Sequence, residues 1–194
     1  NHNRRGAFLM ADGTTRHPDM TAERAAEWQL MAAAESGESA VKLAGETYLP
    51  MPSGFKALPN AGRDAYAAYR GRAQFPEILA PSLAAMIGIV HGKAIAIEMP
   101  DAMGYLLENA DGAGLTLDAF HRRITRALLL DGRHAVLADA PEGGGEPYMR
   151  GYSGAAVINW DSDWYVLDEC HWARDGFEWS KVEQYRVLSL DGVY

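Results

Sequence analysis

Apolar residues recur at three- and four-residue intervals through the first two thirds of the chain, a spacing typical of amphipathic helices. Thr21 and Asp64 stand where a helix cap is expected, and Pro81 is expected to delay or kink the helix that contains it. Glycines and prolines between residues 48 and 62 predict a loop. The expected helices cover residues 21–35, 38–45, 64–73, 76–90 and 117–130.

The last of these helices has the clearest pattern. Its apolar stripe runs from Leu117 through Phe120 to Leu128, and three arginines fall on the opposite, solvent-facing side. Thr116 is the expected N-terminal cap, because its hydroxyl can accept a hydrogen bond from the first turn. Gly132 is the expected stop, because glycine readily takes the left-handed conformation that ends a helix.

From residue 134 onward the pattern changes to short runs of β-branched and aromatic residues between turn-forming residues. The expected strands cover residues 134–139, 148–152, 156–160, 164–172 and 182–190. The predicted fold class is therefore α+β, with N-terminal helices packed on a C-terminal, mainly antiparallel sheet. We divide the chain into an N-terminal extension (1–20), a helical part (21–133) and a β-rich part (134–194).

The chain ends shortly after a turn signal. Asp191-Gly192 favours a tight β-hairpin turn, and only Val193 and Tyr194 follow it. Two residues are too few to pair the preceding strand along its length, which would leave a strand edge open. We therefore expect the natural protein to continue beyond Tyr194 and this chain to be one fragment of it.

Composition excludes several classes of protein. Hydrophobic residues make up 48% and charged residues 23% of the 194, a balance that excludes a wholly disordered chain. The formal net charge is −8, so a module that grips nucleic acid by neutralising phosphates is not expected. A lone cysteine, Cys170, cannot form an internal disulfide, which excludes a disulfide-stapled scaffold.

The acidic excess belongs to the second half of the chain. The first 97 residues hold 10 basic and 9 acidic side chains, and the remaining 97 hold 8 and 17. Such an acidic half repels DNA at low ionic strength. The most apolar stretch, residues 78–97, is interrupted by proline, glycine, histidine and lysine, so we expect no membrane span.

One motif suggests catalysis. Residues 151–155 (GYSGA) approach the turn that presents a nucleophilic serine in many hydrolases. That turn needs a strand before the serine and a helix after it, whereas a strand is expected after Ser153. His134 and His171 are the candidate bases, but their spacing from Ser153 supports neither. A small serine hydrolase that uses Ser153 is therefore an alternative and not the leading prediction.

The other patterns that suggest a metal site or a phosphate-binding loop do not have the residues or the spacing that such sites need. Residues 109–114 approach a calcium loop, but Leu107 would occupy its first ligand position, so a turn is expected there. The glycines at 143–145 are not followed by the Lys-Ser or Lys-Thr of a phosphate-binding loop. The adjacent pair Cys170-His171 points to opposite faces of a strand. We predict no catalytic, cofactor-binding or metal-binding residue, and a chain that is not an enzyme.

Six segments, taken in order, carry a resemblance to a known family. They are residues 46–50 (ETYLP), 66–73 (YAAYRGRA), 88–93 (GIVHGK), 111–120 (DGAGLTLDAF), 132–141 (GRHAVLADAP) and 157–160 (VINW). Through them the chain resembles a phage and prophage family of unknown function that is similar to phage portal proteins. The resemblance covers most of residues 40–190, and the proteins of that family are longer than this chain.

The resemblance implies a structural role in a tailed bacteriophage or prophage. Portal proteins form a closed ring of identical subunits at one capsid vertex, and this chain would correspond to the peripheral wing part. Double-stranded DNA passes through the ring without sequence-specific contacts, driven by a separate terminase, and capsid and tail or connector proteins dock on it. The implied locations are the virion and, during assembly, the cytoplasm of the bacterial host.

A head–tail adaptor or another phage interaction module is a further alternative. Both structural interpretations need complementary packed surfaces and no reactive cluster. An enzyme would instead need ionisable side chains that converge in a pocket.

Overall fold

The computed structural model describes residues 15–141, 143–190 and 192–193. All of its helices precede its strands along the chain, so the predicted α+β fold class is confirmed. By internal contacts the chain forms two compact units: residues 27–97, and the residues up to 26 together with those from 98 onward. The second unit includes the helix before residue 133 because that helix packs on the first two strands.

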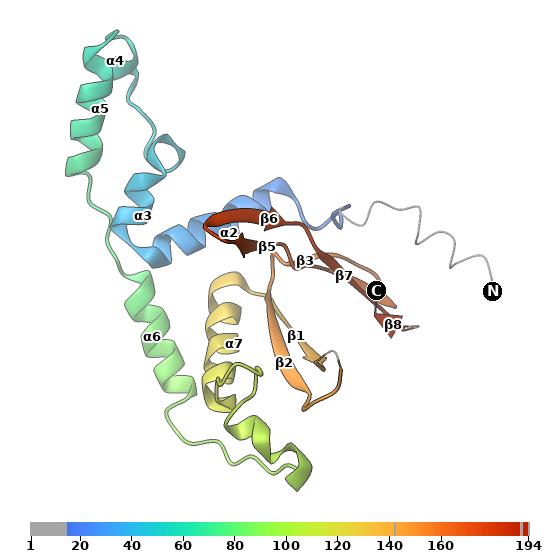
Figure 1. Ribbon diagram of the computed structural model, residues 1–194. Helices are drawn as coiled ribbons and strands as arrows, with labels where there is room; N and C mark the ends of the chain where they lie inside the picture. The colour runs from blue at the N-terminus through green and yellow to red at the C-terminus, as the bar shows by residue number, and fades with distance from the viewer. Residues whose placement is uncertain (1–14, 142, 191, 194) are drawn as a thin grey trace. The chain divides into compact units, whose positions relative to one another are not determined.

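Short helices make up the unit of residues 27–97 (Figure 1). The helices of this part of the chain are α2 (Ala22–Ser36), α3 (Glu38–Leu43), η1 (Gly45–Thr47), α4 (Ser53–Lys56), α5 (Ala61–Arg72) and α6 (Leu79–Val90). Polar contacts join them across long sequence separations. The Glu77 carboxylate accepts a hydrogen bond from the backbone N–H of Glu38 at 2.7 Å, and the Tyr66 hydroxyl donates to the Leu49 carbonyl at 2.8 Å.

The ends of these helices match the predictions only in part. Thr21 caps α2 as predicted, because its hydroxyl accepts a hydrogen bond from the backbone N–H of Arg24 at 3.2 Å. The prediction that Asp64 caps α5 is wrong, since α5 begins at Ala61 and Asp64 lies in its first turn. The expected loop contains α4, which packs closely against the start of α5. The α6 helix begins at Leu79, later than the expected residue 76, so Pro81 lies in its first turn. Backbone N–H groups there have no acceptor within the helix, so the N–H that proline lacks is not missed.

The other unit begins with η2 (Asp101–Leu107) and α7 (Leu117–Asp131). Thr116 and Gly132 end α7 as predicted: the Thr116 hydroxyl accepts from Ala119 N–H at 3.3 Å, and Gly132 is left-handed with φ 72°. The predicted turn before α7 is also confirmed. The Asp111 carboxylate accepts hydrogen bonds from backbone N–H groups of Ala113 and Leu115, at 2.9 and 3.0 Å, which lower its pKa.

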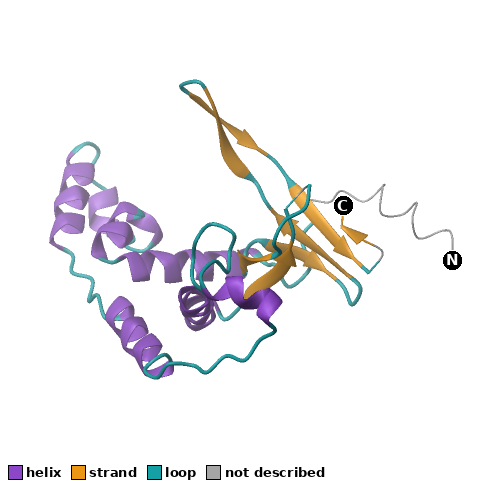
Figure 2. Ribbon diagram, turned by 60° about the horizontal axis from the view of Figure 1, so that its bottom comes forward, coloured by secondary structure: helices purple, strands orange, loops and turns teal. Residues whose placement is uncertain are grey.

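In the described part of the chain, eight strands form three antiparallel sheets, which Figure 2 shows as orange arrows. The strands are β1 (His134–Asp139), β2 (Tyr148–Ser153), β3 (Val157–Trp160), β4 (Trp164–Asp168), β5 (His171–Asp175), β6 (Glu178–Val182), β7 (Tyr185–Ser189) and β8 (Gly192–Val193). β1 pairs with β2, β5 pairs with β6, and the third sheet has the order β3-β4-β7-β8. The predicted terminal hairpin is confirmed by the pairing of β7 with β8, although Asp191 and Tyr194 lie outside the described residues.

Two expected long strands are wrong. Residues 164–172 form β4 and β5, because the chain leaves one sheet at Glu169 and enters another at His171. Residues 182–190 divide in the same way between the end of β6 and β7. The turn after β4 is fixed by Asp168, whose carboxylate accepts a hydrogen bond from the backbone N–H of Cys170 at 2.9 Å. The outcome is a separate two-stranded sheet, β5–β6.

The hydrophobic core lies between β2 and the four-stranded sheet. Tyr152, Val157 and Leu167 form a buried cluster, and partly buried apolar side chains of β1 and β7 pack against it. In the described part of the helical unit, Tyr66 and Leu83 are the buried hydrophobic side chains. Among the described residues, no helix combines the length and the apolar character that crossing a lipid bilayer requires.

Candidate functional site

A buried carboxylate stands at the centre of the β-rich unit. Glu169 lies in the two-residue link between β4 and β5, and its side chain is only 2% exposed. Its backbone N–H donates to the Gln184 carbonyl at 2.9 Å, which holds this link against the matching link between β6 and β7. A charged carboxylate in such a place is costly unless other side chains pair with it.

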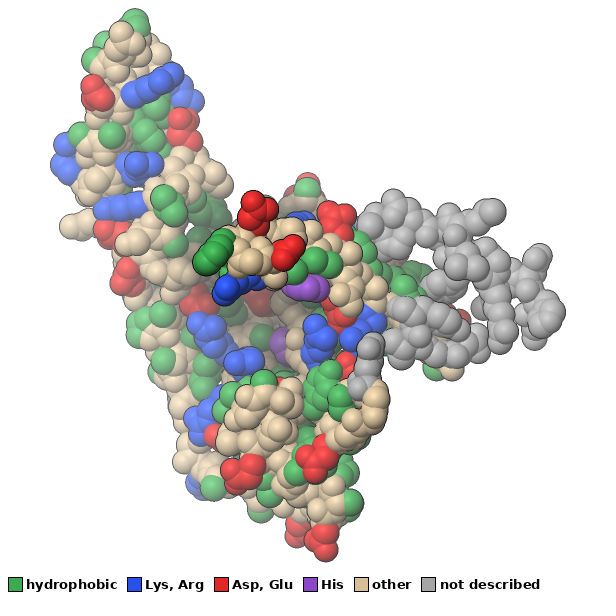
Figure 3. Space-filling view, viewed as in Figure 1, with side chains coloured by type: hydrophobic (Ala, Val, Ile, Leu, Met, Phe, Trp, Pro, Cys, Tyr) green, Lys and Arg blue, Asp and Glu red, His purple; other side chains and the backbone are tan. Residues whose placement is uncertain are grey.

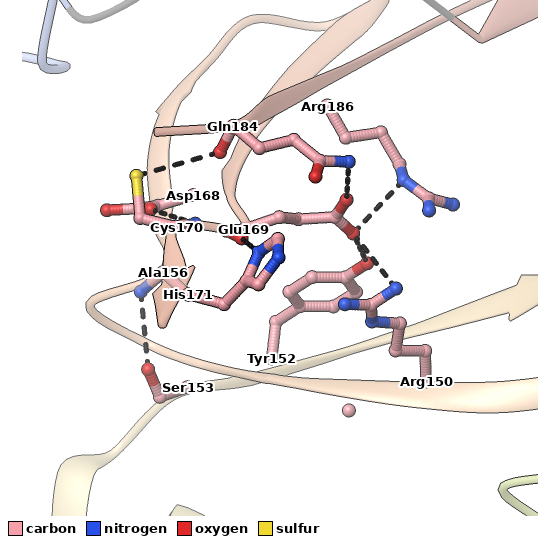
Figure 4. Close-up of a pocket in the computed structure, with 11 residues that line it drawn as sticks. Arg150, Tyr152, Ser153, Ala156, Asp168, Glu169, Cys170, His171, Gln184 and Arg186 are labelled. Atoms are coloured by element: carbon pink, nitrogen blue, oxygen red, sulfur yellow. Dashed lines mark hydrogen bonds and ion pairs between the residues drawn. The ribbon is translucent and has the colours of Figure 1, made fainter. Parts of the chain in front are cut away.

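Four side chains from three segments converge on this carboxylate (Figure 4). The Tyr152 hydroxyl and the Arg186 Nε–H donate to Glu169 Oε1, at 2.5 and 3.1 Å. Arg150 approaches the same oxygen at 3.4 Å, and Gln184 donates to Oε2 at 3.4 Å. Burial and the Glu169 carboxylate raise the pKa of Tyr152, so at neutral pH its phenol is protonated and serves as a donor.

Arg186 extends this cluster to the first strand. Its Nη1 forms an ion pair with Asp139 Oδ2 at the end of β1, and the Tyr148 hydroxyl donates to the same oxygen at 3.3 Å. Burial acts to raise the pKa of Asp139, but the hydrogen bonds from Arg186, the Ala140 backbone and Tyr148, together with the charge of Arg186, outweigh burial and lower it. Burial likewise acts to lower the pKa of Arg186, yet Asp139 and Glu169 raise it overall. Both groups are therefore charged across the neutral range.

The cluster of Asp139, Arg150, Tyr152, Glu169 and Arg186, here called the carboxylate clamp, joins two sheets. Its residues come from β1 and β2 on one side and from the β4–β5 link and β7 on the other. Its two arginines are matched by two carboxylates. The Tyr152 hydroxyl and the Arg186 Nε–H both donate to the same acceptor, Glu169 Oε1. This arrangement fixes the position of the β1–β2 hairpin against the four-stranded sheet. Because the Tyr152 hydroxyl and the Glu169 carboxylate are hydrogen-bonded to each other, the cluster acts to hold the two sheets together.

An open pocket of about 550 Å³ lies over the clamp and brings two sequence candidates near it. Ser153 and His171 both line this pocket. The Ser153 hydroxyl accepts a hydrogen bond from the backbone N–H of Ala156 at 3.3 Å, and His171 Nδ1 lies 3.1 Å from the Glu169 carbonyl oxygen. Figure 4 shows each side chain engaged with these backbone atoms and not with the other. In the described part of the chain, Ser153 forms no hydrogen bond with a histidine.

Ser153 also lacks the local structure of a nucleophilic serine. It ends β2, and a turn and then β3 follow it where a hydrolase would have a helix. The other candidate base, His134, faces Ser153 across the β1–β2 ladder but lies over Gly151, where an added Cβ would come within 2.8 Å of its Nε2. Burial lowers the pKa of His134, with Asp131 acting against this.

A stack of rings and a guanidinium lies at the start of the same unit. The rings of His17 and Trp160 stack with centroids 3.8 Å apart, and the Arg133 guanidinium lies 4.6 Å from the Trp160 centroid. Arg133 also donates to the Gly154 carbonyl at 2.8 Å, and the His17 backbone N–H donates to the Ile158 carbonyl at 2.8 Å. This stack attaches the segment before α2 to β3.

Sequence reasoning missed every member of the clamp. The one local signal was the pair Asp168-Glu169, because acidic residues directly after the apolar run 164–167 must be paired or exposed. Among the described residues, no group of three or more histidine, cysteine, aspartate or glutamate side chains could hold a metal ion. No family model matches this chain, and no curated protein matches it.

Proposed function

We propose that this protein is a structural component of a tailed bacteriophage or prophage, corresponding to the wing part of a portal protein. In this role, copies of the complete protein assemble into the ring through which double-stranded DNA is packaged and to which the tail is joined. Terminase, capsid and tail or connector proteins would be its partners. Its places of action would be the capsid vertex and, before that, the host cytoplasm.

The observation that carries the proposal is an apolar helix left open to solvent. Along α6 (Leu79–Val90), Leu83 is the buried apolar side chain, whereas Ile89 is 81% exposed and Val90 57%. Met86, also exposed, lies three and four residues before them on one stripe, because residues at those intervals share a helix face. Soluble monomers seldom present apolar stripes of this kind, and burial in an assembly removes them from water.

The two compact units suit head-to-tail assembly. A ring in which each subunit contacts the next through two different faces requires two unlike surfaces on every copy. The helical unit presents apolar side chains, and the unit with the strands carries the acidic excess of the second half of the sequence. The clamp supports this role because it holds the β1–β2 hairpin against the four-stranded sheet, and a repeated contact between copies needs the same arrangement in each copy.

The charge supports passage of DNA without tight binding. Affinity for duplex DNA comes largely from lysine and arginine contacts with phosphates. With a net charge of −8, this chain offers few unopposed cations, so DNA can slide past it while the terminase supplies the force. We therefore do not expect this protein to recognise a specific DNA sequence.

Electron microscopy of the complete gene product tests the proposal. Negatively stained particles are expected to be rings with one predominant number of subunits and a central channel. Particles that remain monomeric at micromolar concentration and above would contradict it. A serine-directed fluorophosphonate probe provides a control for the hydrolase alternative, because labelling that disappears in Ser153→Ala would favour an enzyme.

A further inference from the structure

The β5–β6 hairpin (His171–Val182), here called the arm, is a ladder of its own. Its two strands pair with each other in continuous register from His171↔Val182 to Asp175↔Glu178, and they belong to neither of the other sheets. Figure 2 shows the arm projecting from the four-stranded sheet as a two-stranded ribbon. An isolated two-stranded hairpin is only marginally stable in water, so a projecting arm is typically completed by something that covers it.

One face of the arm is aromatic and cationic. Trp172 lies directly opposite Lys181, and Arg174 directly opposite Trp179, so these four side chains share a face. The two tryptophans are 64% and 62% exposed, and Phe177 in the turn is 99% exposed. Tryptophan and arginine are the residues that most often dominate protein–protein binding energy. The exposed face thus has the composition of an interface.

The same chain carries a surface of complementary chemistry on and beside η2 (Asp101–Leu107). Met103 and Leu107 are 45% and 43% exposed there. Glu98, Asp101 and Glu108 lie close to them in the sequence, all three are exposed, and none forms an ion pair with a described residue. Figure 3 shows acidic and apolar side chains together at the lower end of the view, where Figure 1 places η2.

From this complementarity we infer that the arm of one copy docks on the η2 surface of the next copy. The tryptophans and Phe177 would cover Met103 and Leu107, and Arg174 and Lys181 would face the carboxylates of Glu98, Asp101 and Glu108. The two surfaces are unlike, so the contact is head-to-tail and repeats around a ring or along a filament. This inference rests on the proposed function in that it names one of the contacts that would close the ring.

Cross-linking between two singly substituted chains tests the contact directly. Both chains carry Cys170→Ser, and one also carries Phe177→Cys while the other carries Met103→Cys. A flexible bismaleimide is expected to give cross-linked dimers when the two chains are mixed and none with either chain alone. Equal cross-linking in the mixture and in the separate chains would overturn the inference, because it would show contact without the predicted polarity.

Charge reversal provides an independent readout in the same assay. Arg174→Glu with Lys181→Glu on the arm should reduce the mixed cross-link at least tenfold, because like charges would then face each other. Asp101→Lys with Glu108→Lys on the other chain should restore it. The matched control is Ala173→Ser with Ser180→Ala on the opposite face of the arm, which should leave the yield unchanged. Failure of the reversed pair to rescue would contradict the assigned surface.

The inference and the proposed function fail in different experiments. If the complete gene product with both Trp172→Ser and Trp179→Ser still forms unaltered rings, the arm contact is overturned and the structural role remains intact. Thermal melting of each variant separates docking from folding, since exposed side chains add little to the stability of the single chain. An absence of rings together with a specific cross-link would overturn the proposed ring while the contact between copies stands.

Discussion

The two compact units differ in how they are held together. The unit with the strands has a buried cluster around Tyr152 and a clamp in which Glu169 and Asp139 are matched by arginines. The helical unit buries Tyr66 and Leu83 among its described apolar side chains and leaves the stripe of α6 open. This difference agrees with the proposed role, in which the exposed apolar stripe of α6 would be buried in an assembly.

Removing the buried carboxylate should cause the largest loss of stability. Glu169→Ala leaves Arg150 and Arg186 without their shared acceptor and is expected to cost about 3–5 kcal/mol, as for one partner of a buried ion pair. Urea denaturation followed by tryptophan fluorescence measures this, because four of the five tryptophans lie in the β-rich part. Glu183→Ala, at an exposed site, should cost less than about 1 kcal/mol. Equal losses would mean that the clamp is not a structural joint.

Two substitutions in α6 should separate folding from assembly. Leu83→Ala removes a side chain that is 3% exposed and should destabilise the helical unit by about 2–5 kcal/mol. Ile89→Glu changes a residue that is 81% exposed and should alter the free energy of unfolding of the single chain by less than about 0.5 kcal/mol. The same Ile89→Glu should abolish oligomers of the complete gene product, measured by sedimentation velocity. Oligomers that persist would remove α6 from the interface.

A pair of glycine substitutions tests the close packing of the β-rich unit. In Gly151→Ala the new Cβ would lie 2.8 Å from His134 Nε2 and 3.8 Å from Phe120 Cζ, so a loss of about 1–3 kcal/mol is expected. Gly71→Ala, in α5 with open space around it, should instead stabilise by about 0.5–1 kcal/mol. Thermal melting compares the two. A neutral Gly151→Ala would show that His134 moves away freely.

The smallest effect concerns pH. Burial lowers the pKa of His134, so the folded state favours its neutral form and binds a proton less readily than the unfolded chain. The stabilising contribution is present above the unfolded pKa of about 6.5 and is lost as the pH falls below it. Urea midpoints between pH 8 and pH 5.5 should therefore decline less in His134→Gln than in the wild type.

Local signals were predictable, and long-range pairings were not. Thr116 and Gly132 act within one helical turn, so their residue types alone identify the ends of α7. The clamp joins Tyr152 to Glu169 and Asp139 to Arg186, which lie 17 and 47 residues apart. Such pairs form only after the sheets have packed. The division of residues 164–172 into two strands depends on the same packing, which explains why the alternating pattern predicted one long strand.

Counting the copies in the assembled particle tests the central claim most directly. Native mass spectrometry of the complete gene product should give one predominant oligomer whose mass is a fixed multiple of the subunit mass. The Ile89→Glu variant should give the subunit mass alone. A wild-type protein that appears only as a single subunit, over the concentrations at which it is soluble, would contradict the account of this chain as a building block of a ring.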